Sequence, residues 1–139
     1  PGLWAPLNAT WGIENRTCGS RVILGPSDSA ARIELRQTAA DINPHVAMAT
    51  CLGSGLYGIA NAVSPPPETS GDATTAGEAA LALPLTLEAA VARLRESKAA
   101  REVLGDAFVD HYLRTRDWEC RQYNRSVSEW ELRRYFEAV

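Results

Sequence analysis

The sequence Arg32-Ile33-Glu34-Leu35-Arg36 alternates charged and apolar residues without a break. In a β-strand, successive side chains point to opposite faces of the sheet. The stretch therefore predicts a strand with Ile33 and Leu35 buried under helices, and with Arg32, Glu34 and Arg36 together on the other face. Alternation of this kind is also typical of any antiparallel strand with one face in water. By itself it leaves a binding site and a solvated face as alternatives.

Two further arginines, Arg16 and Arg21, precede this strand. They lie in residues 7–24, which are rich in Thr, Trp, Ile and Val and are predicted to be extended. Because the two arginines are five residues apart, a regular strand would place them on opposite faces, and Gly19 between them could mark a bulge that redirects one. Arginines gathered around Glu34 would suit an anionic ligand held together with a divalent metal ion.

The middle of the chain predicts one helix and one long connection. Asn43 and Pro44 have the residue types of an N-cap and a first helical position, so we expect a helix over residues 43–62. Its Gly53-Ser54-Gly55-Leu56-Tyr57-Gly58 matches the dinucleotide-binding pattern, which requires a strand before the glycines and a helix beginning at them. Because neither condition holds, we attribute these glycines to close helix packing. Residues 63–84, with three consecutive prolines, predict a mobile loop.

Residues 85–139 predict helices only. The first begins at Thr86 and has a break near Ser97, and Asp106 is expected to cap a longer one. Ser128-Glu129-Trp130-Glu131 is a capping box for the last. With residues 1–40 as a flap and strands, the fold class is α+β: antiparallel strands in the N-terminal third packed under helices, and an all-helical C-terminal part.

Composition excludes several classes of function. The 139 residues suffice for one domain. A net charge of −3 with a pI near 5.4 is not the positive charge expected of a protein that binds nucleic acid or an acidic membrane. No apolar run reaches the length of a membrane span. Three widely spaced cysteines lack metal-finger spacing, which favours reduced thiols and a cytoplasmic location. His45 and His111 have no second His or Cys at ligand spacing, so neither is expected to bind metal.

Four motifs follow one another in a fixed order. They are Pro-Gly-x-x-Ala-Pro from Pro1, Trp-Gly-x-x-Asn-Arg-Thr from Trp11, Arg-Ile-Glu-x-Arg from Arg32 and Ala-Asp-x-Asn-Pro from Ala40. Together they resemble the C-terminal catalytic region of the glutamine synthetase superfamily. The Trp11 motif is most similar to the branch that joins glutamate to organic amines, the glutamate–putrescine ligases and their relatives. In that family the region lies in the last third of a much longer polypeptide, so we expect a fragment that is inactive alone.

The resemblance implies an ATP-dependent ligation in which the glutamate side-chain carboxylate becomes an acyl phosphate that an amine attacks. Carried over by position, Glu34 would be one ligand of Mg²⁺ or Mn²⁺. Arg16 and Arg21 would be catalytic and ATP-binding residues that contact phosphoryl oxygens. Arg32 would bind ATP, and Arg36 would bind a carboxylate of glutamate. Arginine suits these roles because its planar fork makes bidentate contacts.

Trp4 bears on the identity of the amine. Ammonia-using members of the family carry a glutamate at this place, which can bind ammonium and take its proton. An indole instead offers a flat apolar wall and a cation–π contact to an organic amine. The alternative is that Trp4 only holds a loop in place and does not contact the amine.

The resemblance also implies partners: glutamate and an amine as substrates, a homo-oligomeric ring, no nucleic acid and no membrane. A glutamine synthetase that uses ammonia and a catalytically inactive structural homologue are the rival functions.

Overall fold

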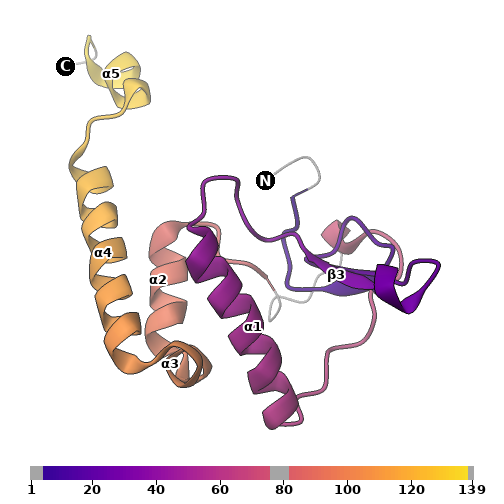
Figure 1. Cartoon of the computed structure of the whole chain (residues 1–139). Helices are drawn as coiled ribbons and strands as arrows, with labels where there is room; N and C mark the ends of the chain where they lie inside the picture. The colour runs from indigo at the N-terminus through magenta and orange to yellow at the C-terminus, as the bar shows by residue number, and fades with distance from the viewer. Residues whose placement is uncertain (1–4, 76–81, 138–139) are drawn as a thin grey trace. The chain divides into compact units, whose positions relative to one another are not determined.

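The structure is a computed structural model that describes residues 5–75 and 82–137, and the chain divides into two compact units, residues 1–83 and 84–139. The first unit holds a three-stranded sheet and one long helix (Figure 1). Its elements are β1 (Trp11–Ile13), β2 (Ser20–Ile23), η1 (Asp28–Ala30), β3 (Arg32–Leu35), α1 (Pro44–Ala60) and η2 (Ala73–Thr75). The second unit is helical, with α2 (Leu87–Glu96), α3 (Lys98–Leu104), α4 (Asp106–Arg125) and α5 (Glu129–Tyr135). A small sheet followed by helices confirms the α+β class.

The sheet is mixed, whereas the sequence led us to expect antiparallel strands only. β2 pairs antiparallel with β3, but β1 pairs parallel with β2. The cause lies in the residues between β1 and β2. Glu14 has a φ of 51°, and the chain turns after it and runs back to Ser20 beside the start of β1. The Glu14 amide donates to the Val22 carbonyl at 2.9 Å and so completes the parallel pair of Ile13 with Val22.

The predicted alternation of β3 is confirmed, but the predicted burial is wrong. In the pairing of β2 with β3, Ile33 lies opposite Val22 and Leu35 lies opposite Ser20, on one face of the sheet. Ile33 is nevertheless 66% exposed and Leu35 is 41% exposed. This face opens on an apolar groove of about 1210 Å³, and within the described part of the first unit no side chain fills it. Its apolar lining includes Trp11, Val22, Ile33 and Leu35 of the strands and Ala47, Leu52, Leu56 and Ile59 of α1.

Helix α1 begins as predicted, but its glycines do not pack closely. Asn43 is the N-cap, and its side chain accepts hydrogen bonds from the amides of His45 and Val46. A Cβ added at Gly55 or Gly58 would have no neighbour within 4 Å among the described residues. Within the first unit, the close packing that we expected at Gly55 and Gly58 is therefore absent.

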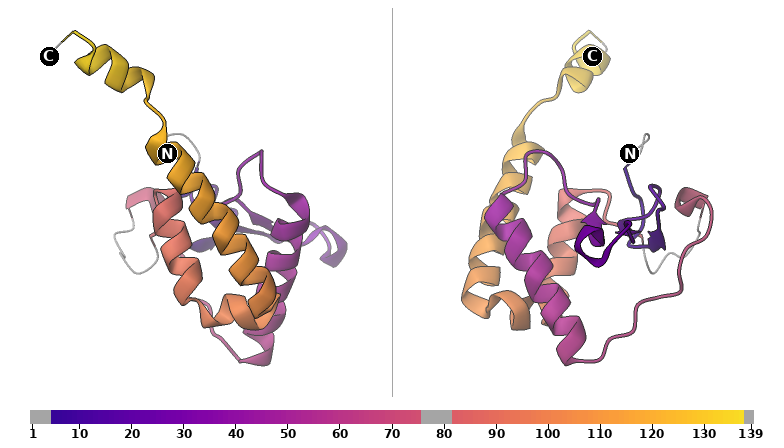
Figure 2. Two further views of the ribbon diagram at one scale, coloured as in Figure 1. Left: turned by 90° about the vertical axis from the view of Figure 1, so that its left-hand side faces the viewer. Right: turned by 45° about the vertical axis from the view of Figure 1, so that its right-hand side comes forward.

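The second unit has a small core of its own between α2 and α4, which lie side by side (Figure 2). Val91, Val109 and Leu113 are buried there. The predicted break at Ser97 is confirmed, since Ser97 separates α2 from α3, and its side chain also caps α3. The predicted cap at Asp106 is wrong: Gly105, with a φ of 81°, takes the N-cap position.

Asp106 is the first residue of α4, and it forms an ion pair with Arg101 at 2.8 Å. The capping box of Ser128 and Glu131 is confirmed at the start of α5. The helical unit therefore follows the sequence signals closely.

We predict that the isolated chain associates in solution through the apolar groove. Burying apolar surface is favourable by roughly 25 cal/mol per Å², and exposed Leu52 and Leu56 lie on the α1 side of the groove. Sedimentation velocity should show oligomers, and Leu52→Asp with Leu56→Asp should shift the chain to a monomer. The control is Val127→Asp, at an exposed apolar residue outside the groove, which should leave the oligomers unchanged. A monomeric chain with a high, cooperative melting transition would contradict the prediction.

Candidate functional site

The Trp11–Thr17 motif holds a distant segment of the chain against β1. We call residues 66–73 the clamped segment. The Trp11 indole Nε1 donates to the Pro66 carbonyl at 2.7 Å, and the Thr69 amide donates to the Trp11 carbonyl at 2.9 Å. A Cβ at Gly12 would lie 2.8 Å from the Thr69 carbonyl oxygen, so this close approach requires glycine. The Trp and Gly of the motif thus have a structural role.

Asn15 and Thr17 complete the clamp. The Asn15 side-chain amide donates to the carbonyls of Thr69 at 3.2 Å and Gly71 at 2.8 Å. Its Oδ1 accepts from the backbone amide and the hydroxyl of Thr17. The Thr17 hydroxyl in turn accepts from the Ala73 amide at 2.9 Å. These bonds were not anticipated for a segment predicted to belong to a mobile loop over 63–84; its mobility stays a prediction.

Arg16 lies between these two anchored residues and points to solvent. It sits in the turn after β1 rather than in a strand, which corrects the expectation of an extended segment through Arg16 and Arg21. The side chain is exposed and makes no hydrogen bond or ion pair within residues 5–75 and 82–137. The turn therefore presents a guanidinium that is available to an anionic ligand.

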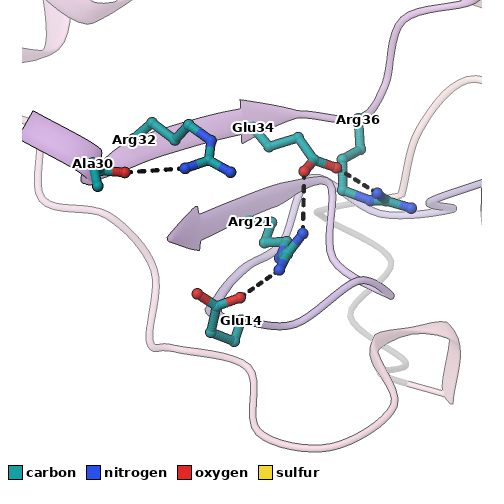
Figure 3. Close-up of polar contacts among 6 residues, drawn as sticks. All are labelled: Glu14, Arg21, Ala30, Arg32, Glu34 and Arg36. Atoms are coloured by element: carbon teal, nitrogen blue, oxygen red, sulfur yellow. Dashed lines mark hydrogen bonds and ion pairs between the residues drawn. The ribbon is translucent and has the colours of Figure 1, made fainter. Parts of the chain in front are cut away.

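A row of alternating charges crosses the sheet on the face opposite the groove (Figure 3). Arg21 on β2 lies opposite Glu34 on β3, and its Nη1 donates to Glu34 Oε2 at 3.3 Å. Glu34 Oε1 accepts from Arg36 Nη1 at 2.6 Å. At the other end, Arg21 Nη2 forms an ion pair with Glu14. We call Glu14, Arg21, Glu34 and Arg36 the charged row.

The two arginines of the charged row are more protected than its two glutamates. The side chains of Arg21 and Arg36 are each 17% exposed, whereas Glu34 is 38% and Glu14 is 51% exposed. The hydrogen bond from Arg36, with the charges of Arg36 and Arg21, holds the pKa of Glu34 below its ordinary value. The hydrogen bond that Arg21 donates to Glu14 is the largest cause that raises the pKa of Arg21 above its ordinary value. Both shifts favour the charged forms of Glu34 and Arg21.

The structure does not bring every predicted site residue into this row. Arg32 is exposed, and its Nη1 donates to the Ala30 carbonyl at 3.0 Å rather than to Glu34. Trp4 lies outside the described residues. Glu14 is the member of the row that sequence reasoning did not single out. Its only sequence signal was its position inside the Trp11 motif.

The described residues supply one carboxylate toward a divalent metal, not a complete metal site. No group of three or more His, Cys, Asp or Glu side chains that could hold a metal ion occurs within residues 5–75 and 82–137. Mg²⁺ is usually bound by one or two carboxylates together with waters and phosphate oxygens. Each Glu34 oxygen keeps accepting capacity beside its arginine, since a carboxylate has about four lone-pair sites. Glu34 therefore fits the role of a single ligand.

Other features of the described part give no further site. None of its helices is both long and apolar enough to cross a bilayer. Cys18, Cys51 and Cys120 are free thiols, as the sequence predicts. Burial and the nearby charges of Glu88 and Asp117 raise the pKa of Cys120, so this thiol is not activated as a nucleophile.

Comparison with known proteins identifies the family to which this chain belongs. The glutamine synthetase catalytic domain matches residues 1–135. This chain belongs to that family. A solved structure of GmaS without ligand is similar to the family member described here, with a TM-score of 0.78 and 29% identity over 96% of this chain and 31% of the GmaS chain.

Curated relatives of this family member include both ammonia and amine ligases. It is 42% identical to type-1 glutamine synthetase 2 of Dictyostelium discoideum over 99% of this chain and 27% of that protein. It is equally 42% identical to a glutamate–isopropylamine ligase of a Pseudomonas species, over 98% of this chain and 30% of that ligase. The chain thus spans less than a third of these relatives, and the comparisons do not separate the two branches.

We predict that Arg36→Gln raises the pKa of Glu34 toward its ordinary value. Because the folded-state pKa is depressed, the row stabilises the fold above the unfolded-state pKa of Glu34, and this contribution is lost as the pH falls through the folded-state value. Titration of the Glu34 carboxyl carbon by ¹³C NMR measures the change. Arg95→Gln, which breaks an ion pair with Asp117 in the second unit, is the control and should leave Glu34 unchanged. The same pKa of Glu34 in the unsubstituted chain, in Arg36→Gln and in Arg95→Gln would contradict the prediction.

We also predict that Asn15→Ala releases the clamped segment. The change removes two hydrogen bonds to it, each worth about 1 kcal/mol, so cleavage between residues 66 and 73 by limited proteolysis should accelerate about 5- to 30-fold. Asn61→Ala is the matched control, since the Asn61 side-chain amide donates to the Tyr57 carbonyl at the end of α1 and not to the clamped segment. Cleavage at the same rate in both variants would mean that Asn15 does not hold the segment.

Proposed function

We propose that this chain is part of an ATP-dependent ligase that activates the side-chain carboxylate of glutamate and joins it to an amine. The observation that carries the proposal is the charged row on one face of the sheet, in a chain of the glutamine synthetase catalytic domain family. Two protected guanidiniums beside a carboxylate form a preorganised place for anionic groups.

The proposed reaction has two steps. In the first, an oxygen of the glutamate side-chain carboxylate attacks the γ-phosphorus of ATP, the bond to the ADP oxygen breaks, and an acyl phosphate forms. In the second, the amine nitrogen attacks the carbonyl carbon and loses a proton, and phosphate leaves. Negative charge on the transferring phosphoryl group must be stabilised in the first step, which suits positively charged side chains.

Each arginine takes a distinct part in this proposal. Arg21, and Arg16 from its exposed turn, would contact oxygens of the transferring phosphoryl group. Arg32 would bind the nucleotide from the far end of β3. Arg36 would hold a carboxylate of glutamate through its bidentate fork. Glu34 would be one ligand of Mg²⁺ or Mn²⁺, and such an ion would offset the negative charge of the phosphate oxygens.

The chain alone is proposed to be inactive. It supplies one carboxylate for a metal and spans less than a third of its relatives, so the remaining ligands and nucleotide contacts would come from elsewhere in a longer protein. We further propose that the active protein is a cytoplasmic homo-oligomeric ring. Native mass spectrometry of the full-length protein would test its assembly.

The amine is the finer point of the proposal. Relatives at the same identity include a glutamine synthetase and a glutamate–isopropylamine ligase. Trp4 favours the organic amine, because an indole offers apolar contact where ammonia-using members place a carboxylate. Ammonia is the second candidate, favoured by the equal identity to the Dictyostelium discoideum glutamine synthetase.

The experiment that tests the function is amine-dependent ADP release by the full-length protein. ATP, Mg²⁺ and glutamate are held constant while ammonia, isopropylamine, ethanolamine and putrescine are compared. The proposal expects release of ADP that requires both glutamate and one of these amines. Absence of release with every amine and with ammonia would favour the inactive structural homologue.

We predict a higher kcat/KM for an organic amine than for ammonia, and a dependence of this ratio on Trp4. Apolar contacts discriminate modestly, so Trp4→Ala should lower kcat/KM for the larger amine by about 10- to 200-fold. Trp4→Glu should reduce the difference in kcat/KM between the organic amine and ammonia, because a carboxylate gives ammonium a charge-assisted hydrogen bond worth roughly 1.5–3 kcal/mol. The control Trp118→Ala removes an exposed tryptophan of α4 and should not change kcat/KM for the organic amine or for ammonia. Ammonia as the best substrate, unaffected by either Trp4 substitution, would identify a plain glutamine synthetase.

A further inference from the structure

Glu14 is the residue of the charged row to which the proposed function assigns no role. It follows β1 directly and has a φ of 51°, in the left-handed region that a glutamate rarely adopts. Its amide is held by the Val22 carbonyl at 2.9 Å. The backbone of β2 therefore fixes the place from which the Glu14 side chain extends, and the unusual φ is maintained by this contact.

Among the residues that the structure describes, the Glu14 carboxylate bonds to the Arg21 guanidinium (Figure 3). Arg21 Nη2 binds Glu14 and Arg21 Nη1 binds Glu34, so the planar fork is held between two carboxylates. Arg21 Nε is buried and has no hydrogen-bond partner among the described residues. With both Nη atoms anchored, the orientation of the guanidinium plane is set from two sides.

A purely structural role for Glu14 is a weak explanation. Glu14 is 51% exposed, and ion pairs at this level of exposure contribute little to the stability of a fold. Glu34 already provides Arg21 with a carboxylate on the other strand. What Glu14 adds is a second anchor that prevents Arg21 from swinging toward solvent, and an arginine fixed in this way needs no reorganisation when an anion arrives.

We propose that Glu14 is a positioning residue that holds the Arg21 guanidinium in the orientation required for the transferring phosphoryl group. The inference rests on the proposed function and adds to it a residue that acts only through Arg21. Because Arg36 lies at the far end of the row from Glu14, the glutamate-binding step is independent of this anchor.

The test compares variants of the full-length protein by amine-dependent ADP release. Glu14→Ala should lower kcat by about 10- to 100-fold, as a misoriented contact to the reacting group does, and should leave KM for glutamate unchanged. Glu14→Gln keeps an oxygen that accepts from Arg21 and should recover most of the loss. In an Arg21→Lys background, Glu14→Ala should change the residual kcat by no more than about 2-fold, because the two residues act as one unit.

Asp117→Ala is the matched control, since it removes an arginine-paired carboxylate of the second unit, bound to Arg95 at 2.7 Å. It should shift the melting temperature as little as Glu14→Ala does and leave kcat unchanged. A crystal structure of Glu14→Ala gives a second measurement that does not depend on turnover. In it, the Arg21 guanidinium should turn away from Glu34.

The outcomes separate the two proposals. An active protein in which Glu14→Ala leaves kcat unchanged, or lowers it equally in the Arg21→Lys background, overturns the role of Glu14 alone. An unmoved Arg21 guanidinium in the Glu14→Ala crystal structure overturns it as well. An unsubstituted protein that releases no ADP with any amine or with ammonia overturns the proposed function, and the crystal structure then decides whether Glu14 positions Arg21.

Discussion

Arg21 and Glu34 lie directly opposite each other in the antiparallel pair of β2 and β3, and this register determines the whole of the charged face. Residues opposite each other in such a pair share a face of the sheet. A slip of one residue would carry Glu34 to the face that Ile33 and Leu35 now occupy and would separate it from Arg21 on β2. The groove face and the charged face are therefore two consequences of one backbone pairing.

The balance of charge in the row explains how two arginines can lie at low exposure on this face of the sheet. Each interior charge has an opposite charge on both sides, so removal from water is offset along the row rather than at one pair. An incoming anion would meet Arg21 and Arg36 already oriented by carboxylates. Arg16 and Arg32, which lie outside the row, add positive charge without such anchors.

The clamped segment gives the Trp11 motif a physical meaning beyond resemblance. Trp11, Gly12, Asn15 and Thr17 all contact residues 66–73, more than fifty positions away in the sequence. Arg16 of the same motif is exposed to solvent. The motif thus combines residues that fix a loop against β1 with an exposed arginine, and Glu14 inside it anchors a residue of the next strand.

Local patterns in the sequence determined the helices, the α+β class and the two faces of β3. Caps at Asn43, Ser97 and Ser128 act within one turn of backbone, and alternation follows from the geometry of a single strand. Resemblance of the ordered motifs gave the family. None of these signals depends on contacts between distant segments, and for that reason they could be read from the chain alone.

Tertiary structure decided the rest. The parallel pairing of β1, the exposure of Ile33 and Leu35, and the open space at Gly55 depend on which surfaces meet, and local sequence does not specify this. Glu14 entered the charged row because its backbone turns at a positive φ and aims its carboxylate at the next strand. Period and propensity describe one segment at a time, whereas a charged row and a clamped loop require two segments brought together in three dimensions.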